Sequence, residues 1–235
     1  MPYQLYKGLA FTTIWLGNMV SKRKCCKRFC DKQSLLYYNK ESGGEMRTAV
    51  DCVAAFFTLL STEYELILGR KGVSVTLRLA FDKKDCFHLM GLQYLRDRPE
   101  LNRDRGKVFD EIMNGTIKLE QIQTSDFYGK IEKRIHFLPL LENMIDDNRT
   151  IFKYNQKANL YSVIEADYLM ENSMELQNLF LFLSREEGNR YFCRSFFPEE
   201  KMDYTKNQAS WTLLYKKKID RLTGKERILY NKMKD

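Results

Sequence analysis

The sequence predicts an α+β fold, in which an N-terminal β-hairpin and helices pack on a C-terminal antiparallel β-sheet. Apolar residues recur mainly at helical spacing between residues 46 and 148. From residue 149 onward, short runs rich in aromatic and β-branched residues are typical of strands. Only short connections separate these runs, which favours antiparallel pairing of neighbouring strands.

We expect three segments along the chain. Residues 1–45 form a basic extension that is disordered or not part of the fold. Residues 46–148 form the helical part with its hairpin, and residues 149–235 form the sheet part of the same domain. The content of 44% hydrophobic and 13% aromatic residues is typical of a globular protein.

The first elements carry clear local signals. A helix is expected to begin at Thr48, because Asp51 follows three residues later as in a capping box. Residues 64–68 and 73–81 alternate as a β-hairpin, and Asp82 can cap a helix that runs to about residue 97. The remaining expected helices lie near 104–114, 117–123 and 127–146, the last of them interrupted at Pro139. The remaining expected strands lie at 150–154, 160–170, 176–184, 190–196, 211–219 and 226–231.

Positive charge is concentrated at the two ends of the chain. The net charge is +8, with +5 on residues 1–45, +6 on residues 201–235 and −3 between them. A clustered positive surface suits a polyanion. A solvated basic surface without a partner remains the alternative.

The cysteines and the N-terminal apolar run bear on the cellular compartment. Cys52, Cys86 and Cys193 lie in apolar segments, where we expect free buried thiols in a reducing cytosol, hence a cytoplasmic protein. Cys25, Cys26 and Cys30 have no fourth Cys or His ligand nearby, so no metal site is predicted. Residues 9–20 are too short to span a bilayer and lack the features of a secretory signal, so no stable membrane insertion is expected.

The sequence lacks the motifs of several enzyme classes. The sequence contains no Walker-type phosphate loop, no G-x-G-x-x-G after a strand, no H-E-x-x-H, no nucleophile elbow and no paired C-x-x-C. Acid–base chemistry assisted by a few cations remains. RNA suits this chemistry because its 2′-hydroxyl is a built-in nucleophile, which needs only a base, an acid and a cation at the phosphate.

His88 is the candidate acid–base residue. It shares a helical face with Gly91 and Leu92, so its imidazole is expected to point toward packed surface, where the pKa can be tuned. The alternative is a core histidine bonded to a main-chain carbonyl. His136 lies in a charged helix and is expected to be structural or on the surface.

A second set of candidates lies in the C-terminal half. Strand alternation places Arg194 and Phe196 on one face and Cys193 and Ser195 on the other. An arginine flanked by aromatic rings can hold a phosphate while a ring stacks on a base. The other polar candidates are Tyr204, Thr205 and Lys206 in a loop, Lys216 on the next strand, and Arg70 and Lys71 at the tip of the hairpin.

Seven motifs occur in one order: G-R-K-G (69–72), F-H-L-M-G-L-Q-Y-L (87–95), F-K-Y-N (152–155), I-E-A-D-Y-L (164–169), C-R-S-F-F-P (193–198), D-Y-T-K (203–206) and L-L-Y-K (213–216). From about residue 46 to the C-terminus, the chain resembles the fourth phage-associated subgroup of the barnase–EndoU–colicin–RelE-like nucleases. The resemblance implies a barnase/RelE-like α+β fold and an endoribonuclease that needs no metal or other cofactor. It also implies a setting of phages and mobile elements in bacteria, in which such nucleases act as toxins or effectors.

The resemblance also implies roles for the candidate residues. His88 would be the general acid or base, Arg194 the phosphate clamp, and Tyr204 and Thr205 further catalytic contacts. The substrate-binding residues would be Arg70, Lys71, Ser195, Lys206 and Lys216. The expected partners are RNA and an immunity, antitoxin or phage protein. A catalytically inactive RNA-binding or protein-interaction module with the same fold is the alternative.

Overall fold

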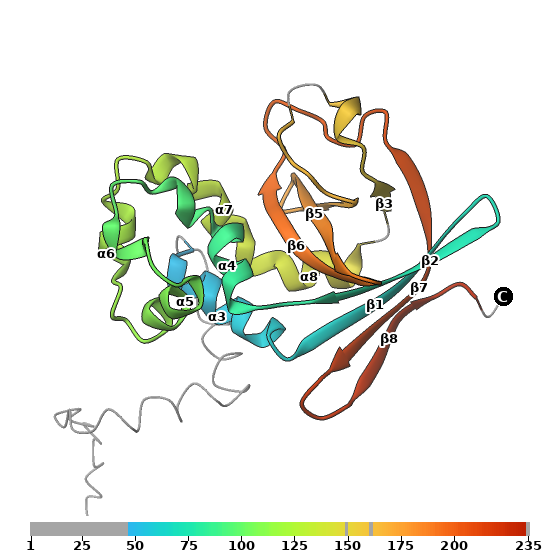
Figure 1. The fold of residues 1–235 in the computed structure, drawn as a ribbon, viewed down its shortest axis with the longest axis horizontal. Helices are drawn as coiled ribbons and strands as arrows, with labels where there is room; N and C mark the ends of the chain where they lie inside the picture. The colour runs from blue at the N-terminus through green and yellow to red at the C-terminus, as the bar shows by residue number, and fades with distance from the viewer. Residues whose placement is uncertain (1–46, 149, 160–161, 234–235) are drawn as a thin grey trace, which may run out of the picture.

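The computed structural model describes residues 47–148, 150–159 and 162–233, so the expected extension at 1–45 lies outside it. Most helices precede most strands along the chain (Figure 1). The α-helices are α3 (Ala49–Leu59), α4 (Lys83–Met90), α5 (Arg105–Met113), α6 (Leu119–Gln123), α7 (Glu132–Phe137) and α8 (Leu141–Asp147). Short 3-10 helices are η1 (Leu92–Tyr94), η2 (Pro99–Leu101), η3 (Tyr128–Lys130), η4 (Leu138–Leu140) and η5 (Gln156–Ala158). The strands are β1 (Thr62–Arg70), β2 (Val73–Ala80), β3 (Thr150–Lys153), β4 (Tyr168–Met174), β5 (Gln177–Glu187), β6 (Arg190–Pro198), β7 (Ala209–Asp220) and β8 (Glu226–Asn231).

Seven strands form a closed barrel. Hydrogen bonds run in the order β1-β2-β6-β5-β4-β3-β7, and β7 pairs back with β1. The pairs are antiparallel except β2 with β6, which is parallel and joins only Arg78 to Arg190 and Leu79 to Tyr191. Strand β8 pairs with β7 outside the closed ring. Helices α3 to α7 gather on one side of the barrel (Figure 1).

The predicted fold class is wrong. We expected a hairpin and helices packed on an antiparallel sheet, in the barnase/RelE-like arrangement, but the hairpin is itself part of a closed mixed barrel. The physical reason lies in the hairpin's two outer edges, whose main-chain groups need partners. Strand β7 pairs with the free edge of β1, and β6 pairs with the free edge of β2. Closure pairs nearly the whole outer edge of β1, and pairs β2 at Arg78 and Leu79.

The predicted hairpin itself is confirmed. Strands β1 and β2 are antiparallel, and Lys71 and Gly72 form the turn with φ of 50° and 79°. Positive φ at both central residues is the geometry of a tight hairpin turn. Tyr64, Leu66 and Leu68 alternate toward the core and are fully buried. Local patterning was therefore sufficient to identify this pair.

Three other boundaries differ from the predictions. The helix expected to reach residue 97 ends at Met90, because Gly91 adopts a left-handed conformation with φ of 81°. The helix expected at 127–146, with an interruption at Pro139, is divided into η3, α7, η4 and α8, and Pro139 lies in η4. The strand expected at 160–170 begins only at Tyr168.

The core has two hydrophobic clusters, which lie on opposite faces of β5. Leu179, Leu181 and Leu183 face the main core shared by the helices and the barrel. Phe180 and Phe182 face a smaller cluster of mostly aromatic residues. Cys52, Cys86 and Cys193 are buried free thiols, as predicted. Among the residues that the structure describes, none of the helices has the length and apolar character that a bilayer-spanning segment requires.

Candidate functional site

A cavity of about 860 Å³ opens between α4, the start of α5 and β6. Three of the predicted site residues line it: His88, Arg194 and Ser195. His88 comes from the helical half of the chain and the other two from a barrel strand. The fold therefore brings together residues that are more than one hundred positions apart in the sequence.

His88 reaches the cavity because α4 begins immediately after β2. The side chains of Asp82 and Asp85 form a capping box that starts this helix. The half-buried imidazole lies edge-on to Phe87, with ring centroids 5.8 Å apart. Within the described residues it makes no hydrogen bond, so the alternative of a histidine bonded to a main-chain carbonyl does not apply there.

The electrostatic environment keeps His88 neutral. Burial lowers the pKa of this imidazole, and the positive charges of Arg105 and Arg194 lower it further. A neutral imidazole is the form that accepts a proton. At neutral pH the site therefore holds a base beside two guanidinium groups.

Arg194 owes its position to a β-bulge. In the pairing of β5 with β6, Ser195 lies opposite Phe182 and Cys193 lies opposite Leu183, so Arg194 is the extra residue. Its side chain is exposed, whereas Cys193 and Phe196 are both buried. The predicted alternation, with Arg194 and Phe196 on one face, is wrong because the bulge shifts the register.

The cavity carries more positive than negative side chains. Its basic residues are Lys83, Lys84, Arg105, Arg190, Arg194 and Arg221, and its acidic residues are Asp82, Asp85 and Glu186. Lys83 is paired with Asp110 at 2.7 Å, and Arg190 lies 4.0 Å from Glu186. Within the part of the chain that the structure describes, the side chains of the other four cations form no ion pair. The cavity can therefore attract phosphate.

Asp85 is the second titratable group of interest on the cavity wall. It is 5% exposed, and burial raises its carboxyl pKa to about 6. It lies one helical turn before His88, on the same side of α4. Sequence reasoning did not single out Asp85 as a site residue; its side chain also forms part of the capping box of α4.

Sequence reasoning missed other cavity residues. Tyr94 lies in the motif that contains His88, but it was not singled out. Arg105 begins α5, and its approach to His88 is a tertiary contact that local pattern does not reveal. Arg134 does not line the cavity itself but contacts the strand that does. It donates hydrogen bonds to the Phe196 carbonyl at 3.1 Å and to the Ser195 hydroxyl at 3.4 Å.

The hairpin tip and the 203–206 loop do not line the cavity. Arg70 and Lys71 lie at the far end of β1 and β2 from Ala80, which does line it. Seven strand residues separate the two ends, a distance of about 23 Å at 3.3 Å per residue. Tyr204 packs on Phe180 and Phe182 in the smaller aromatic cluster, at 5.5 and 5.3 Å between ring centroids.

Thr205 and Lys206 are not brought to the cavity either. The Thr205 hydroxyl donates to the Asp203 carboxylate at 2.6 Å within the loop. Lys206 is exposed beside it. The structure thus groups these two residues with Tyr204 rather than with His88.

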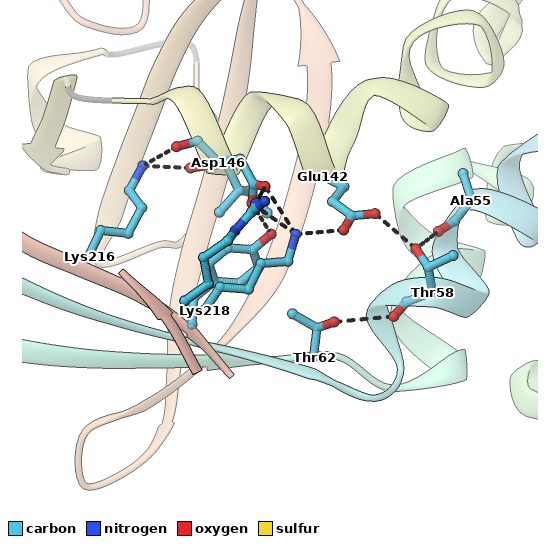
Figure 2. Close-up of polar contacts among 10 residues, drawn as sticks. Ala55, Thr58, Thr62, Glu142, Asp146, Lys216 and Lys218 are labelled. Carbon is cyan, nitrogen blue, oxygen red and sulfur yellow. Dashed lines mark hydrogen bonds and ion pairs between the residues drawn. The ribbon is translucent and has the colours of Figure 1, made fainter. Parts of the chain in front are cut away.

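Lys216 is buried, with 1% of the residue exposed. Its ammonium donates to the carbonyl of Ile145 at 2.6 Å and also to those of Asp146 and Asn148, at the C-terminal end of α8 (Figure 2). A cation placed there complements the helix dipole and the unpaired carbonyls. In this conformation the Lys216 ammonium cannot contact a substrate.

The neighbouring cations of the C-terminal block are paired as well. Lys218 contacts Glu142 at 2.6 Å and Asp146 at 3.0 Å (Figure 2), and Arg227 contacts Asp146 at 2.7 Å. Lys217 lies 3.0 Å from Glu226. The contacts of Lys218 and Arg227 connect α8 to β7 and β8, and that of Lys217 connects β7 to β8. These three cations of the C-terminal block are thus paired within the fold, whereas Arg221 of the same block lines the cavity.

His136 lies at a smaller, separate cavity of about 250 Å³. Its Nε2 is 3.4 Å from the Glu175 carboxylate, which also binds Arg47. This placement agrees with the prediction that His136 is structural or on the surface. No group of three or more His, Cys, Asp or Glu side chains suited to a metal ion occurs in residues 47–148, 150–159 and 162–233.

Comparisons with known proteins identify one family. Searches of the curated proteins and of the solved structures gave no match to this chain. A sequence model of one family, described as phage-Barnase-EndoU-ColicinE5/D-RelE like nuclease 4, matches residues 49–233. This range contains every residue of the cavity described above and confirms the resemblance drawn from the motifs. The chain therefore belongs to the phage-Barnase-EndoU-ColicinE5/D-RelE like nuclease 4 family.

Proposed function

We propose that this protein is an endoribonuclease that cleaves RNA by acid–base catalysis at the 2′-hydroxyl, without a metal ion. Membership of a nuclease family supports cleavage of a nucleic acid. The observation that carries the proposal is that His88 and Arg194 line the same cationic cavity. A base and a phosphate-binding guanidinium are the two groups that this reaction needs most.

In the proposed reaction, neutral His88 takes the proton of the 2′-hydroxyl. The 2′-oxygen then attacks phosphorus, the bond from phosphorus to the 5′-oxygen breaks, and a 2′,3′-cyclic phosphate forms. Arg194 holds the phosphate oxygens as their negative charge increases. The departing 5′-oxygen takes a proton from an acid of the cavity, for which Asp85 is the candidate because its pKa is raised to about 6.

The test is cleavage of total RNA by the full chain in EDTA, repeated with added Mg²⁺. We expect equal cleavage in both, with cyclic phosphate ends on the products. His88→Ala should lower the rate roughly 10²–10⁴-fold, and Arg194→Ala roughly 10²–10³-fold. His136→Ala and Arg96→Ala are matched controls outside the cavity and should retain the wild-type rate.

Other outcomes would replace this proposal. Cleavage that survives both cavity substitutions would contradict the assignment of the site. Cleavage that requires Mg²⁺ would contradict the metal-independent mechanism. RNA binding without any product would indicate the inactive binding module instead. The proposed role as a phage or mobile-element toxin predicts that expression in bacteria arrests growth, and that His88→Ala relieves the arrest.

A further inference from the structure

Tyr94 presents an aromatic ring to the same cavity. It follows α4 in η1, and 41% of the residue is exposed. An aromatic ring that is exposed within a cavity can pack against a ligand that enters it. Tyr94 is the aromatic lining residue with the largest exposed fraction in the described part of the chain.

The ring is held in place from behind. The guanidinium of Arg134 lies 5.7 Å from the centroid of the Tyr94 ring and 5.0 Å from that of Phe197. Arg134 is itself fixed by its hydrogen bond to the Phe196 carbonyl. A ring supported by a fixed cation loses little entropy when a ligand packs on its exposed side.

Gly91 makes this arrangement possible. A Cβ atom at Gly91 would lie 2.9 Å from Cδ of Arg134 and 3.2 Å from Cδ2 of Tyr94. The absent side chain therefore lets both groups approach the end of α4. The catalytic candidate His88 lies in the last turn of the same helix, and both His88 and Tyr94 line the cavity.

The charges around Tyr94 indicate the class of ligand. Lys84, Arg105, Arg194 and Arg221 line the cavity and form no ion pair within the described residues. Such cations bind phosphate, and an exposed ring beside them binds the flat face of a base. In a duplex the bases are stacked on each other, so a protein ring can stack only on an unpaired base.

We propose that Tyr94 stacks on an unpaired nucleobase, so that the cavity takes single-stranded RNA and rejects a duplex. This inference rests on the proposed function and adds the substrate class. It assigns Tyr94 to binding, whereas His88 acts on the scissile linkage. Stacking tolerates every base, so the expected preference is for unpaired RNA rather than for one sequence.

The experiment measures binding of a fluorescent RNA in which every 2′-hydroxyl is methylated, so that it cannot be cleaved. The full chain should bind the single strand more tightly than its duplex. Tyr94→Leu should weaken single-strand binding about 5- to 150-fold, and Tyr94→Phe should stay within about threefold of wild type. Tyr215→Leu, on β7 and away from the cavity, is the matched control.

Two results would overturn the inference: equal affinity of Tyr94→Leu and wild type for the single strand, or a wild-type preference for the duplex. If Tyr94→Leu fails to fold, quenching of 2-aminopurine in the same RNA by wild-type protein reports stacking directly. If the 2-aminopurine fluorescence is not quenched when the protein binds, the proposed stacking is refuted. Because this RNA cannot be cleaved, loss of the proposed nuclease activity and loss of the proposed stacking are separate results.

Discussion

His88 titrates next to two guanidinium groups, and this sets the pH range in which it can act as a base. Burial, and then the charges of Arg105 and Arg194, oppose protonation of the imidazole, so its pKa lies below the ordinary 6.5. The base is therefore ready at neutral pH. The imidazole loses its capacity to accept a proton only when the pH falls through this lowered pKa.

At the residue scale we predict the effect of Arg105→Gln. Removing this positive charge makes the imidazolium less unfavourable, so the pKa of His88 rises toward 6.5. The acidic limb of the profile of kcat/KM against pH should then move to higher pH, whereas Arg96→Gln should leave it in place. An unmoved limb in Arg105→Gln would show that His88 is not the titrating base.

At the scale of elements, α4 and α8 end in contrasting ways. Helix α4 ends at Gly91, which has φ of 81° and leaves space for Arg134 and Tyr94. Helix α8 ends at the ammonium of Lys216, which binds main-chain carbonyls that would otherwise be unpaired. The first ending shapes the cavity, and the second fastens a helix to the barrel.

Gly91→Ala tests the first ending. The alanine would be strained at this positive φ, and its Cβ would lie 2.9 Å from both Arg134 and Ile131. We expect a loss of about 2–4 kcal/mol in the free energy of unfolding, measured in urea. Gly72→Ala is the matched control, because Gly72 has φ of 79° with nothing within 4 Å of the added Cβ. It should lose only about 1–2 kcal/mol, and an equal loss in both variants would refute the packing argument.

Lys216→Met tests the second ending. The thioether fills a similar volume but leaves the carbonyls of Ile145 and Asn148 without their donor. The expected loss in unfolding free energy is roughly 2–4 kcal/mol. Lys225→Met changes an exposed lysine in the turn before β8 and should cost under about 0.5 kcal/mol. If both substitutions were equally mild, Lys216 would have no such capping role.

At the scale of the whole molecule, closure of the barrel predicts a pattern of hydrogen exchange. The amides that pair β1 with β7 lie between two long strands of the closed barrel, so they should exchange only on global unfolding. Strand β8 lies outside the ring, and its first three residues are exposed. Its amides should exchange well before those of β1. Early exchange in β1 would show that the ring opens locally.

Several features that depend on near neighbours were predicted: the helix caps at Thr48 and Asp82, the β1–β2 hairpin and the strand at 226–231. The end of α4 at Met90 is also local, but it was predicted near residue 97. The closed barrel was not predicted, because β1 meets β7 and β2 meets β6 across more than one hundred residues. Hydrophobic alternation marks a strand but does not identify its partners.

The candidate site shows the same division. His88 and Arg194 were singled out for their chemistry, and both line the cavity. Lys216 was also selected as a candidate, from the basic residues near the C-terminus. Its hydrogen-bond partners at the end of α8 lie about seventy residues away in the sequence, so the sequence pattern did not reveal them. The bulge that exposes Arg194 was also missed, because a single extra residue leaves no mark in composition.

The seven-stranded ring of the barrel can close only after β7 has been synthesised. Strand β7 begins at Ala209, and without it both β1 and β3 lack a neighbour, although nearly all cavity side chains precede it in the chain. A chain synthesised only to residue 208 thus contains nearly all of the cavity's side chains but cannot close the ring. The cavity can therefore take its final shape only after β7 has been added.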